Sequence, residues 1–329
     1  MRILYPVSIR PCLSIRFRTR MNQSRGAAFF LWAAAFSAIF MGTIGAISVF
    51  ANAGAEVVTF FRLFIGAVLM AVYLLVSGQR QKALMWPGGK VLLTGAFLAG
   101  FVVFYIMAVD YTAMANAVMV LYLAPVTASL VAHFFLGERL TSLGVGLIGG
   151  ALLGFAMMME FNFSISGRAE EAIGLAYAAL AMLCYTAFML TNRLIDDRIP
   201  VLTRSGYQML SGALCMLPLM ALEIEPMSLN QWGWLVAAGI VPGFLAIMLA
   251  VIALKSLPAA TFGTLAYLEP ITVVALAWVL FDQGLNNLQL AGCALIITSG
   301  IAQAWLSTRS AEPENLETPL DELLAGQVR

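Results

Sequence analysis

The sequence predicts an all-α membrane protein in which ten transmembrane helices form two inverted five-helix repeats around a central cavity. Three observations lead to this prediction: a strongly apolar composition, ten apolar runs of spanning length, and a tetrapeptide that recurs in the second half of the chain. Of 329 residues, 61% are hydrophobic and 11% are charged, whereas a soluble domain is about half apolar and a quarter charged. Lipid must therefore be the solvent for much of the chain.

The ten apolar runs are each long enough to cross a lipid bilayer as a helix. A bilayer core of about 30 Å requires roughly 20 apolar helical residues. Helix is favoured because the runs are continuously apolar, whereas the strands of a membrane barrel alternate in polarity. The runs cover residues 27–50, 57–77, 91–109, 114–136, 141–159, 171–192, 205–222, 231–253, 258–281 and 287–306.

The basic residues indicate how these spans are oriented, because lysine and arginine collect in cytoplasmic loops. If the N-terminus lies in the cytosol, only Arg168 of the 18 basic residues falls on the outer side, and only Arg62 falls within a span. Compact halves without long loops are typical of bacterial proteins. The sequence therefore predicts an integral multi-pass protein of the bacterial inner membrane with both termini in the cytoplasm.

The expected domain organisation has four parts. The first segment is basic but lacks a long apolar core, so it does not resemble a cleavable signal peptide, and either Met1 or Met21 can be the start. We expect a basic cytoplasmic segment at residues 1–25, a first five-helix repeat at 26–160, a second at 171–306, and a polar, acidic cytoplasmic tail at 307–329.

Several classes of function are disfavoured by the composition and by absent motifs. A net charge of +1 gives no nucleic-acid signature. The four cysteines are scattered and His133 is the single histidine, so we expect neither a metal centre nor a histidine-dependent triad. The sequence has no G-x-x-x-x-G-K-[ST] motif and no G-x-S-x-G element, which argues against an ATPase and an intramembrane serine protease. We predict no cofactor and no enzymatic activity.

A recurring tetrapeptide reveals an internal repeat. Residues Tyr122–Pro125 read YLAP, and residues Tyr267–Pro270 read YLEP. Each half would hold five spans, an odd number, so the second half enters the membrane inverted, as in many secondary transporters. Other matches keep the same order and nearly the same spacing: Phe40–Thr43 with Phe188–Thr191, Gly66 with Gly212, Met70 with Met216, Ala108 with Ala253, and Leu140 with Leu285.

Pro125 and Pro270 lie inside the fourth and ninth predicted spans. Proline lacks an N–H, so each frees the carbonyl four residues earlier, at Leu121 or Ala266, from its helical hydrogen bond. Interrupted helices at corresponding positions of two halves point to a transporter binding site. A pair of packing kinks is the alternative interpretation of these prolines.

These segments resemble the paired signature of EamA-type transporters, which belong to the drug/metabolite transporter superfamily. The resemblance is carried by Leu123–Thr141 (LAPVTASLVAHFFLGERLT), Leu268–Asn286 (LEPITVVALAWVLFDQGLN) and Phe60–Met70 (FFRLFIGAVLM). It implies ten helices in two inverted halves, alternating access, and transport of amino acids, nucleosides, S-adenosylmethionine, sugars or other small metabolites, often outward. The second copy departs from the family at FDQG, Phe281–Gly284, where the family usually repeats L-G-E.

Glu269 and Arg62 are the two ionisable candidates for the substrate or coupling site. An ionisable side chain at membrane depth usually faces an aqueous cavity or a partner. Glu269 could bind a substrate ammonium or carry a proton during transport, and Arg62 could bind a substrate carboxylate as a bidentate fork. The structural alternative is that the two side chains pair with each other, or that Arg62 pairs with Glu56 or reaches the membrane interface.

Aromatic side chains with polar tips form the second group of candidates. In the family, the spans that carry them line the cavity, and such side chains suit organic cations and aromatic solutes. Core packing and interfacial belts are the alternative role for each of them. The candidates are Trp32, Tyr105, Tyr122, Tyr185 and Tyr267, with Asn116 and Thr264 as polar neighbours.

The sequence thus favours a secondary transporter or facilitator of small metabolites, with amino acids or amino-acid-like compounds leaving the cell by alternating access. Uptake or exchange of a larger metabolite, such as S-adenosylmethionine or a nucleoside, is the alternative transport function, and a non-transporting receptor or scaffold is the alternative class. The expected partners are a small-molecule substrate and the lipid bilayer. Gly146, Gly150 and Gly154 predict close helix contact, within the monomer or in a homodimer.

Overall fold

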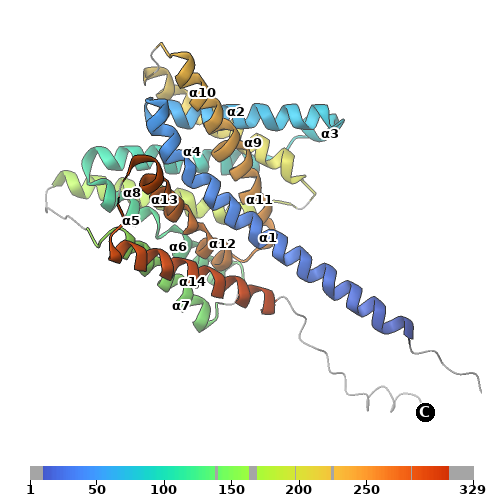
Figure 1. Cartoon of the computed structure of the whole chain (residues 1–329). Helices are drawn as coiled ribbons and strands as arrows, with labels where there is room; N and C mark the ends of the chain where they lie inside the picture. Colours follow the sequence, from blue (N-terminus) through green and yellow to red (C-terminus); the bar gives the residue numbers. More distant parts are fainter. Residues whose placement is uncertain are drawn as a thin grey trace, which may run out of the picture.

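The computed structural model describes residues 10–137, 140–162, 169–196, 198–223, 226–282 and 284–310. Within these ranges every regular element is a helix, which confirms the predicted all-α class (Figure 1). The predicted N-terminal segment before residue 10 and the predicted tail beyond residue 310 lie outside the described residues.

The helices of the first half follow the predicted spans closely. A two-residue turn divides the predicted fourth span, and α7 is the shortest of the predicted spans in this half. The elements are α1 (Arg10–Ala51), α2 (Ala55–Val76), the single-turn α3 (Arg80–Ala83), α4 (Gly89–Tyr111), α5 (Met114–Leu121), α6 (Ala124–Phe135) and α7 (Ser142–Met158).

The helices of the second half also follow the predicted spans. The third span of this half contains a π-helical segment around Pro242, which removes one backbone donor from the ladder. The elements are α8 (Ala169–Arg193), α9 (Val201–Glu223), α10 (Leu229–Ala238), the π-helical segment η1 (Gly239–Leu245), α11 (Ala246–Ser256), α12 (Ala259–Ala266), α13 (Leu268–Phe281) and α14 (Asn287–Ser310).

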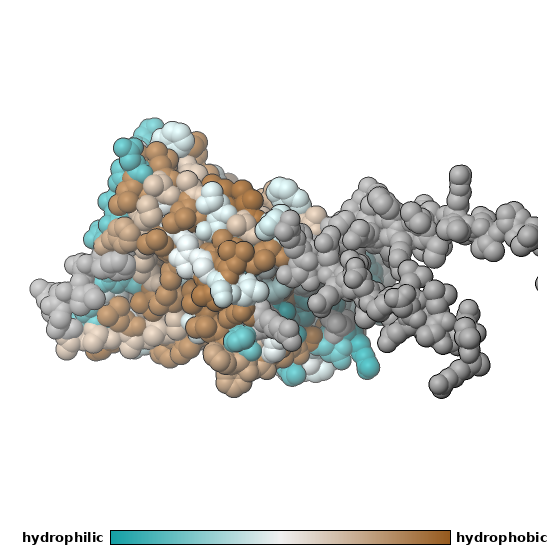
Figure 2. All heavy atoms as spheres, turned by 90° about the horizontal axis from the view of Figure 1, so that it is seen from below, coloured by the Kyte–Doolittle hydropathy of each residue, from teal (hydrophilic) through white to brown (hydrophobic). Residues whose placement is uncertain are grey.

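Nine of the helical stretches in the described chain are long and apolar enough to cross a membrane. The remaining predicted span, the fifth at residues 141–159, corresponds to α7, an apolar helix of 17 residues. Large apolar side chains face outward, among them Leu222, Val279 and Ile301. In Figure 2 hydrophobic side chains spread over the visible face of the bundle, with hydrophilic ones mostly near its edges. This surface suits lipid rather than water.

Helices from the two halves are interleaved. α4 packs against α8 and α9, α2 against α9, and α7 against α14, while α1 packs along α11 and α13. The largest buried cluster spans several helices, and its fully buried members include Leu63 and Met70 of α2, Met209 and Met216 of α9, and Leu254 of α11. Because partners come from opposite halves, neither half buries its apolar face alone.

The glycine face predicted on α7 packs within the monomer. A Cβ on Gly154 would lie 2.7 Å from the carbonyl oxygen of Gly292 on α14, and a Cβ on Gly150 would lie 2.9 Å from the hydroxyl of Ser299. Gly146 faces open space. Two of the three predicted glycines therefore make the close contact between α7 and α14.

One basic residue is buried where the predicted spans leave a loop. The predicted seventh span begins at residue 205, which puts Arg204 in the preceding cytoplasmic loop, but α9 begins at Val201 and Arg204 is only 1% exposed. Arg62 is therefore not the only guanidinium inside a helical span. The helix starts before the apolar run because polar residues of its first turns find partners inside the bundle.

Candidate functional site

Both predicted helix breaks occur at the repeated tetrapeptide. α5 ends at Leu121 and α6 begins at Ala124, with Pro125 in its first turn, where a missing N–H costs nothing. In the second half α12 ends at Ala266 and α13 begins at Leu268. Leu121 and Ala266, whose carbonyls the prolines free, both line one cavity.

This cavity has a volume of about 470 Å³, within the range of small-molecule sites. Its walls come from both halves of the chain: α1, α2, α4, α5 and α7, and α8, α11, α12 and α13. Most of the lining is apolar. The polar side chains in it are Ser37, Ser48, Thr59, Arg62, Tyr105, Tyr122, Tyr185 and Glu269.

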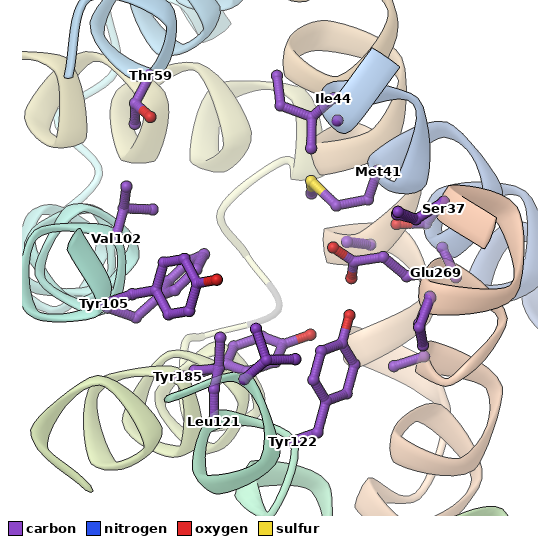
Figure 3. A pocket seen from close by; sticks show the side chains of 18 of the residues that line it. Ser37, Met41, Ile44, Thr59, Val102, Tyr105, Leu121, Tyr122, Tyr185 and Glu269 are labelled. Atoms are coloured by element: carbon purple, nitrogen blue, oxygen red, sulfur yellow. The ribbon is translucent and has the colours of Figure 1, made fainter. Parts of the chain in front are cut away.

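Glu269 lies in the first turn of α13, directly before Pro270. Figure 3 shows its carboxylate pointing into the cavity, with the hydroxyl of Tyr122 directed toward it. The N-terminus of a helix favours negative charge, so this position suits a carboxylate. Gly42 permits the close approach of α1 to the start of α13, because a Cβ at this position would lie 2.6 Å from the carbonyl oxygen of Glu269.

Arg62 is 4% exposed and lines the same cavity from α2. Its Nη1 donates to the sulfur of Met41 at 3.5 Å, and among the described residues its buried Nε has no hydrogen-bond partner. It interacts electrostatically with Glu269. A Cβ on Gly243 of η1 would collide with the carbonyl of Arg62, so that glycine lets α2 pack closely at this point.

Three tyrosines surround the same space. Tyr105, Tyr122 and Tyr185 come from α4, the end of α5 and α8, and their hydroxyls point inward (Figure 3). The ring of Tyr185 lies 5.3 Å from that of Phe101, and the ring of Tyr122 lies 4.5 Å from that of Phe155. The cavity therefore combines an acid, a guanidinium and three phenols within an apolar aromatic wall.

Comparison with known proteins places the chain in a family. The model of the EamA-like transporter family matches residues 26–160 and again residues 172–302. The chain belongs to the EamA-like transporter family. This match confirms the predicted family, which belongs to the drug/metabolite transporter superfamily. The chain is therefore a multi-pass membrane protein and a transporter of this type.

Individual relatives of this EamA-like transporter are 27–29% identical over about three quarters of the chain. An uncharacterized transporter of Bacillus subtilis is 27% identical over 73% of this chain and 78% of its own length. A pseudopaline exporter of Pseudomonas aeruginosa is 29% identical over 75% of this chain and 85% of its own. A crystal structure with a TM-score of 0.73 covers 83% of this chain at 23% identity and shares its fold. The relatives are thus named as transporters.

Three of the predicted site residues of this EamA-like transporter lie away from the cavity. Trp32 is 64% exposed on α1, because its face of the helix turns outward. Asn116 lies on the opposite side of α5 and donates to Glu171 of α8 at 3.4 Å. Thr264 is buried and donates to the carbonyl of Ala260 in its own helix.

Tyr267 and Pro125 join the two breaks instead of lining the cavity. The hydroxyl of Tyr267 donates to the carbonyl oxygen of Tyr122 at 2.6 Å, and Tyr267 is fully buried. Pro125 contacts Gly263 of α12, where a Cβ would lie 2.7 Å from the proline ring. Both residues hold the tetrapeptides together at the base of the cavity.

Several lining residues were not singled out in the sequence. Thr59 precedes Arg62 by three residues, a spacing that places both on one helix face. Ser37 and Met41 share a face of α1 for the same reason, four residues apart. Helical spacing from Arg62 could have identified Thr59, but no sequence signal marked the face of α1 that carries Ser37 and Met41. Within the described residues, no group of three or more histidine, cysteine or acidic side chains could hold a metal.

Proposed function

We propose that this transporter exports amino acids or amino-acid-like zwitterions across the bacterial inner membrane by alternating access. The observation that carries the proposal is the presence of Glu269 and Arg62 in one apolar cavity. A zwitterion needs an acceptor for its ammonium and a donor for its carboxylate. A solute with one charge would leave the other protein charge uncompensated in a medium where that is costly.

Each group in the cavity has a role in this proposal. The carboxylate of Glu269 accepts hydrogen bonds from the ammonium, and the guanidinium of Arg62 binds the carboxylate. The hydroxyls of Tyr105, Tyr122 and Tyr185 add polar contacts, while their rings accommodate an apolar or aromatic side chain of the solute. The surrounding apolar wall favours amino acids with apolar side chains.

Outward transport is supported by one relative. The protein of Pseudomonas aeruginosa that is 29% identical is named as an exporter. Uptake or exchange of a larger metabolite, such as S-adenosylmethionine or a nucleoside, is the second candidate, because a cavity of about 470 Å³ is also large enough for such a solute.

We further propose ten spans in two inverted halves, at residues 26–160 and 171–306, with both termini in the cytosol. The packing supports this arrangement. α4 packs on α8, and its counterpart in the other half, formed by α10, η1 and α11, packs on α1. α2 pairs with its counterpart α9, and α7 with its counterpart α14. If each helix is replaced by its counterpart in the other half, the same pairs of helices remain in contact.

In this orientation the cavity extends from the outer end of the bundle past its middle. The lining residues of α1 reach as far as Ser48 near its C-terminal end, and those of α2 begin at Ala55, its first residue, at the connection that the orientation puts outside. Phe155, Met158 and Met159 at the end of α7 lie at the same level. We infer that the structure represents an outward-facing state.

A binding experiment with matched probes tests the proposed substrate class. Phenylalanine, phenethylamine and hydrocinnamate share one ring and differ in carrying both charges, only the ammonium, or only the carboxylate. We expect the purified transporter to bind phenylalanine roughly 10- to 150-fold more tightly than either of the other two probes, since each lost charged hydrogen bond costs about 1.5–3 kcal/mol. Glu269→Gln should abolish the preference over hydrocinnamate, and Arg62→Gln the preference over phenethylamine.

Asp110→Asn is the matched control, because Asp110 is exposed at the end of α4 and outside the cavity. Equal affinity of the wild type for all three probes would contradict the zwitterion proposal. Binding of S-adenosylmethionine or a nucleoside, without binding of any amino acid in a panel, would support the second candidate instead.

A further inference from the structure

A second polar site lies inside the bundle, outside the cavity. It consists of Thr94 of α4, Asn192 of α8, and Arg204, Ser205 and Gln208 of α9, and we call it the polar cluster. None of these residues is more than 1% exposed. Buried polar and charged groups inside a membrane protein are costly and usually functional.

Hydrogen bonds across the polar cluster tie four helices together. The Nε2 of Gln208 donates to the hydroxyl of Thr94 and to the Oδ1 of Asn192, both at 2.7 Å. Arg204 donates from Nη1 to the carbonyl of Asn192 at 3.2 Å and from Nη2 to the carbonyl of Val251 at 3.4 Å. α4, α8, α9 and α11 are therefore fastened to one another at this level.

The polar cluster lies one helical turn beyond the floor of the cavity. Leu98, four residues after Thr94 on α4, lines the cavity. Phe188 of α8 also lines it, and its carbonyl accepts a hydrogen bond from the Nδ2 of Asn192 at 2.9 Å. One turn of helix spans about 5.4 Å. A solute in the cavity is thus separated from the polar cluster by a thin apolar layer.

The internal repeat relates the polar cluster to the cavity wall. The spacing that aligns Gly66 with Gly212 and Met70 with Met216 also aligns Arg62 with Gln208 and Thr59 with Ser205. Arg62 and Thr59 line the cavity from α2. The polar cluster therefore occupies, at the opposite end of the bundle, the positions that line the open cavity in the first half.

The hydrogen bonding of the polar cluster is incomplete. Among the described residues, neither the Oε1 of Gln208 nor the hydroxyl of Ser205 has a hydrogen-bond partner. An unsatisfied buried polar atom needs an explanation, because apolar side chains would pack this region at lower cost. Exposure to water in another conformation supplies that explanation.

We propose that the polar cluster is the cytoplasmic gate of the solute pathway, and that it lines the pathway when that end opens. This inference rests on the proposed orientation and on the alternating access of the proposed function. In the structure the gate is closed and the cavity opens outward. When it opens, Arg204 and Gln208 offer donors to the carboxylate of a solute that enters from the cytosol.

Cysteine accessibility tests the gate without any solute. In a transporter whose four native cysteines are replaced by alanine, Ser205→Cys reports on the gate and Thr59→Cys on the outer cavity. A membrane-impermeant maleimide is applied to oriented vesicles from either side. We expect fast labelling at position 59 from the outside and slow labelling at position 205 from the cytosolic side.

Gln208→Met keeps the volume of the side chain but removes its hydrogen bonds to Thr94 and Asn192. Because these bonds hold the gate closed, their loss should raise labelling at position 205 by roughly fivefold or more and lower labelling at position 59. Thr94→Val, a milder change that removes one acceptor, should shift both rates in the same directions to a smaller extent.

Gln303→Met is the matched control, because Gln303 is a buried glutamine on α14 that bonds to Thr261, away from the gate. It should leave both rates unchanged. The proposal is overturned if Gln208→Met and Thr94→Val leave the two rates unchanged, or change them in the same direction, as a purely structural network would. Since no substrate is added, this outcome is independent of whether the zwitterion probes bind.

Discussion

At the residue scale, the two tetrapeptides differ where Ala124 corresponds to Glu269. Ala124 is fully buried, and its carbonyl accepts a hydrogen bond from Thr186 of α8 at 3.4 Å. A carboxylate in that place would be enclosed without solvent, at high cost. Glu269 instead faces the cavity (Figure 3). The acid is thus present in the half where this position of the tetrapeptide faces the cavity.

Tyr122 and Tyr267 show that the exposure of a residue to the cavity cannot be predicted from the sequence pattern. They hold equivalent positions in the repeat, so the sequence treats them alike. The structure places Tyr122 in the cavity wall and buries Tyr267 beneath it. Under the alternating access that we propose, only one end of the pathway is open in a given state, so repeat-related residues differ in exposure. A sequence pattern carries no information on which state is present.

The hydrogen bond between the two breaks gives a testable contribution to stability. Tyr267→Phe removes the hydroxyl that donates to the carbonyl of Tyr122 and keeps the ring. We expect the free energy of unfolding in detergent to fall by about 1–3 kcal/mol, because a buried acceptor loses its partner. Tyr73→Phe, on an exposed face of α2, is the control. Equal stability of both variants would show that this bond contributes nothing.

At the scale of elements, helix geometry explains why α7 uses two of its three predicted glycines. A four-residue step advances about 400°, so each step drifts about 40° around the helix. Gly150 and Gly154 still face α14, whereas Gly146 is rotated out of the contact. The spacing predicted close packing correctly, but the partner α14 could not be identified from α7 alone.

Glycine-to-alanine substitutions on α7 test this packing. Gly154→Ala introduces a methyl group 2.7 Å from a backbone oxygen of α14, and overpacking of this kind costs about 1–3 kcal/mol. Gly149→Ala meets no neighbour and should be neutral or stabilising, because alanine favours helix by up to about 1 kcal/mol. Thermal unfolding in detergent compares the two. A destabilisation of equal size in both would contradict the packing assignment.

At the scale of the whole molecule, hydropathy and proline placement predicted the helical spans and both breaks. These features follow from local rules: the length of an apolar run and the missing N–H of Pro125 and Pro270. Which residues line the cavity could not be predicted from such local rules. Trp32 and Tyr105 have similar sequence surroundings, yet only Tyr105 lines the cavity. That difference depends on how α1 and α4 are rotated against the other half.

The central claim is that the molecule exports a zwitterionic metabolite through the cavity that holds Glu269. The most direct test is an untargeted comparison of small molecules outside cells that produce the wild type or Glu269→Gln at equal membrane abundance. We predict an amino acid or amino-acid-like compound that accumulates outside with the wild type and not with the variant. Depletion of such a compound from the medium, or equal accumulation with both proteins, would contradict the claim.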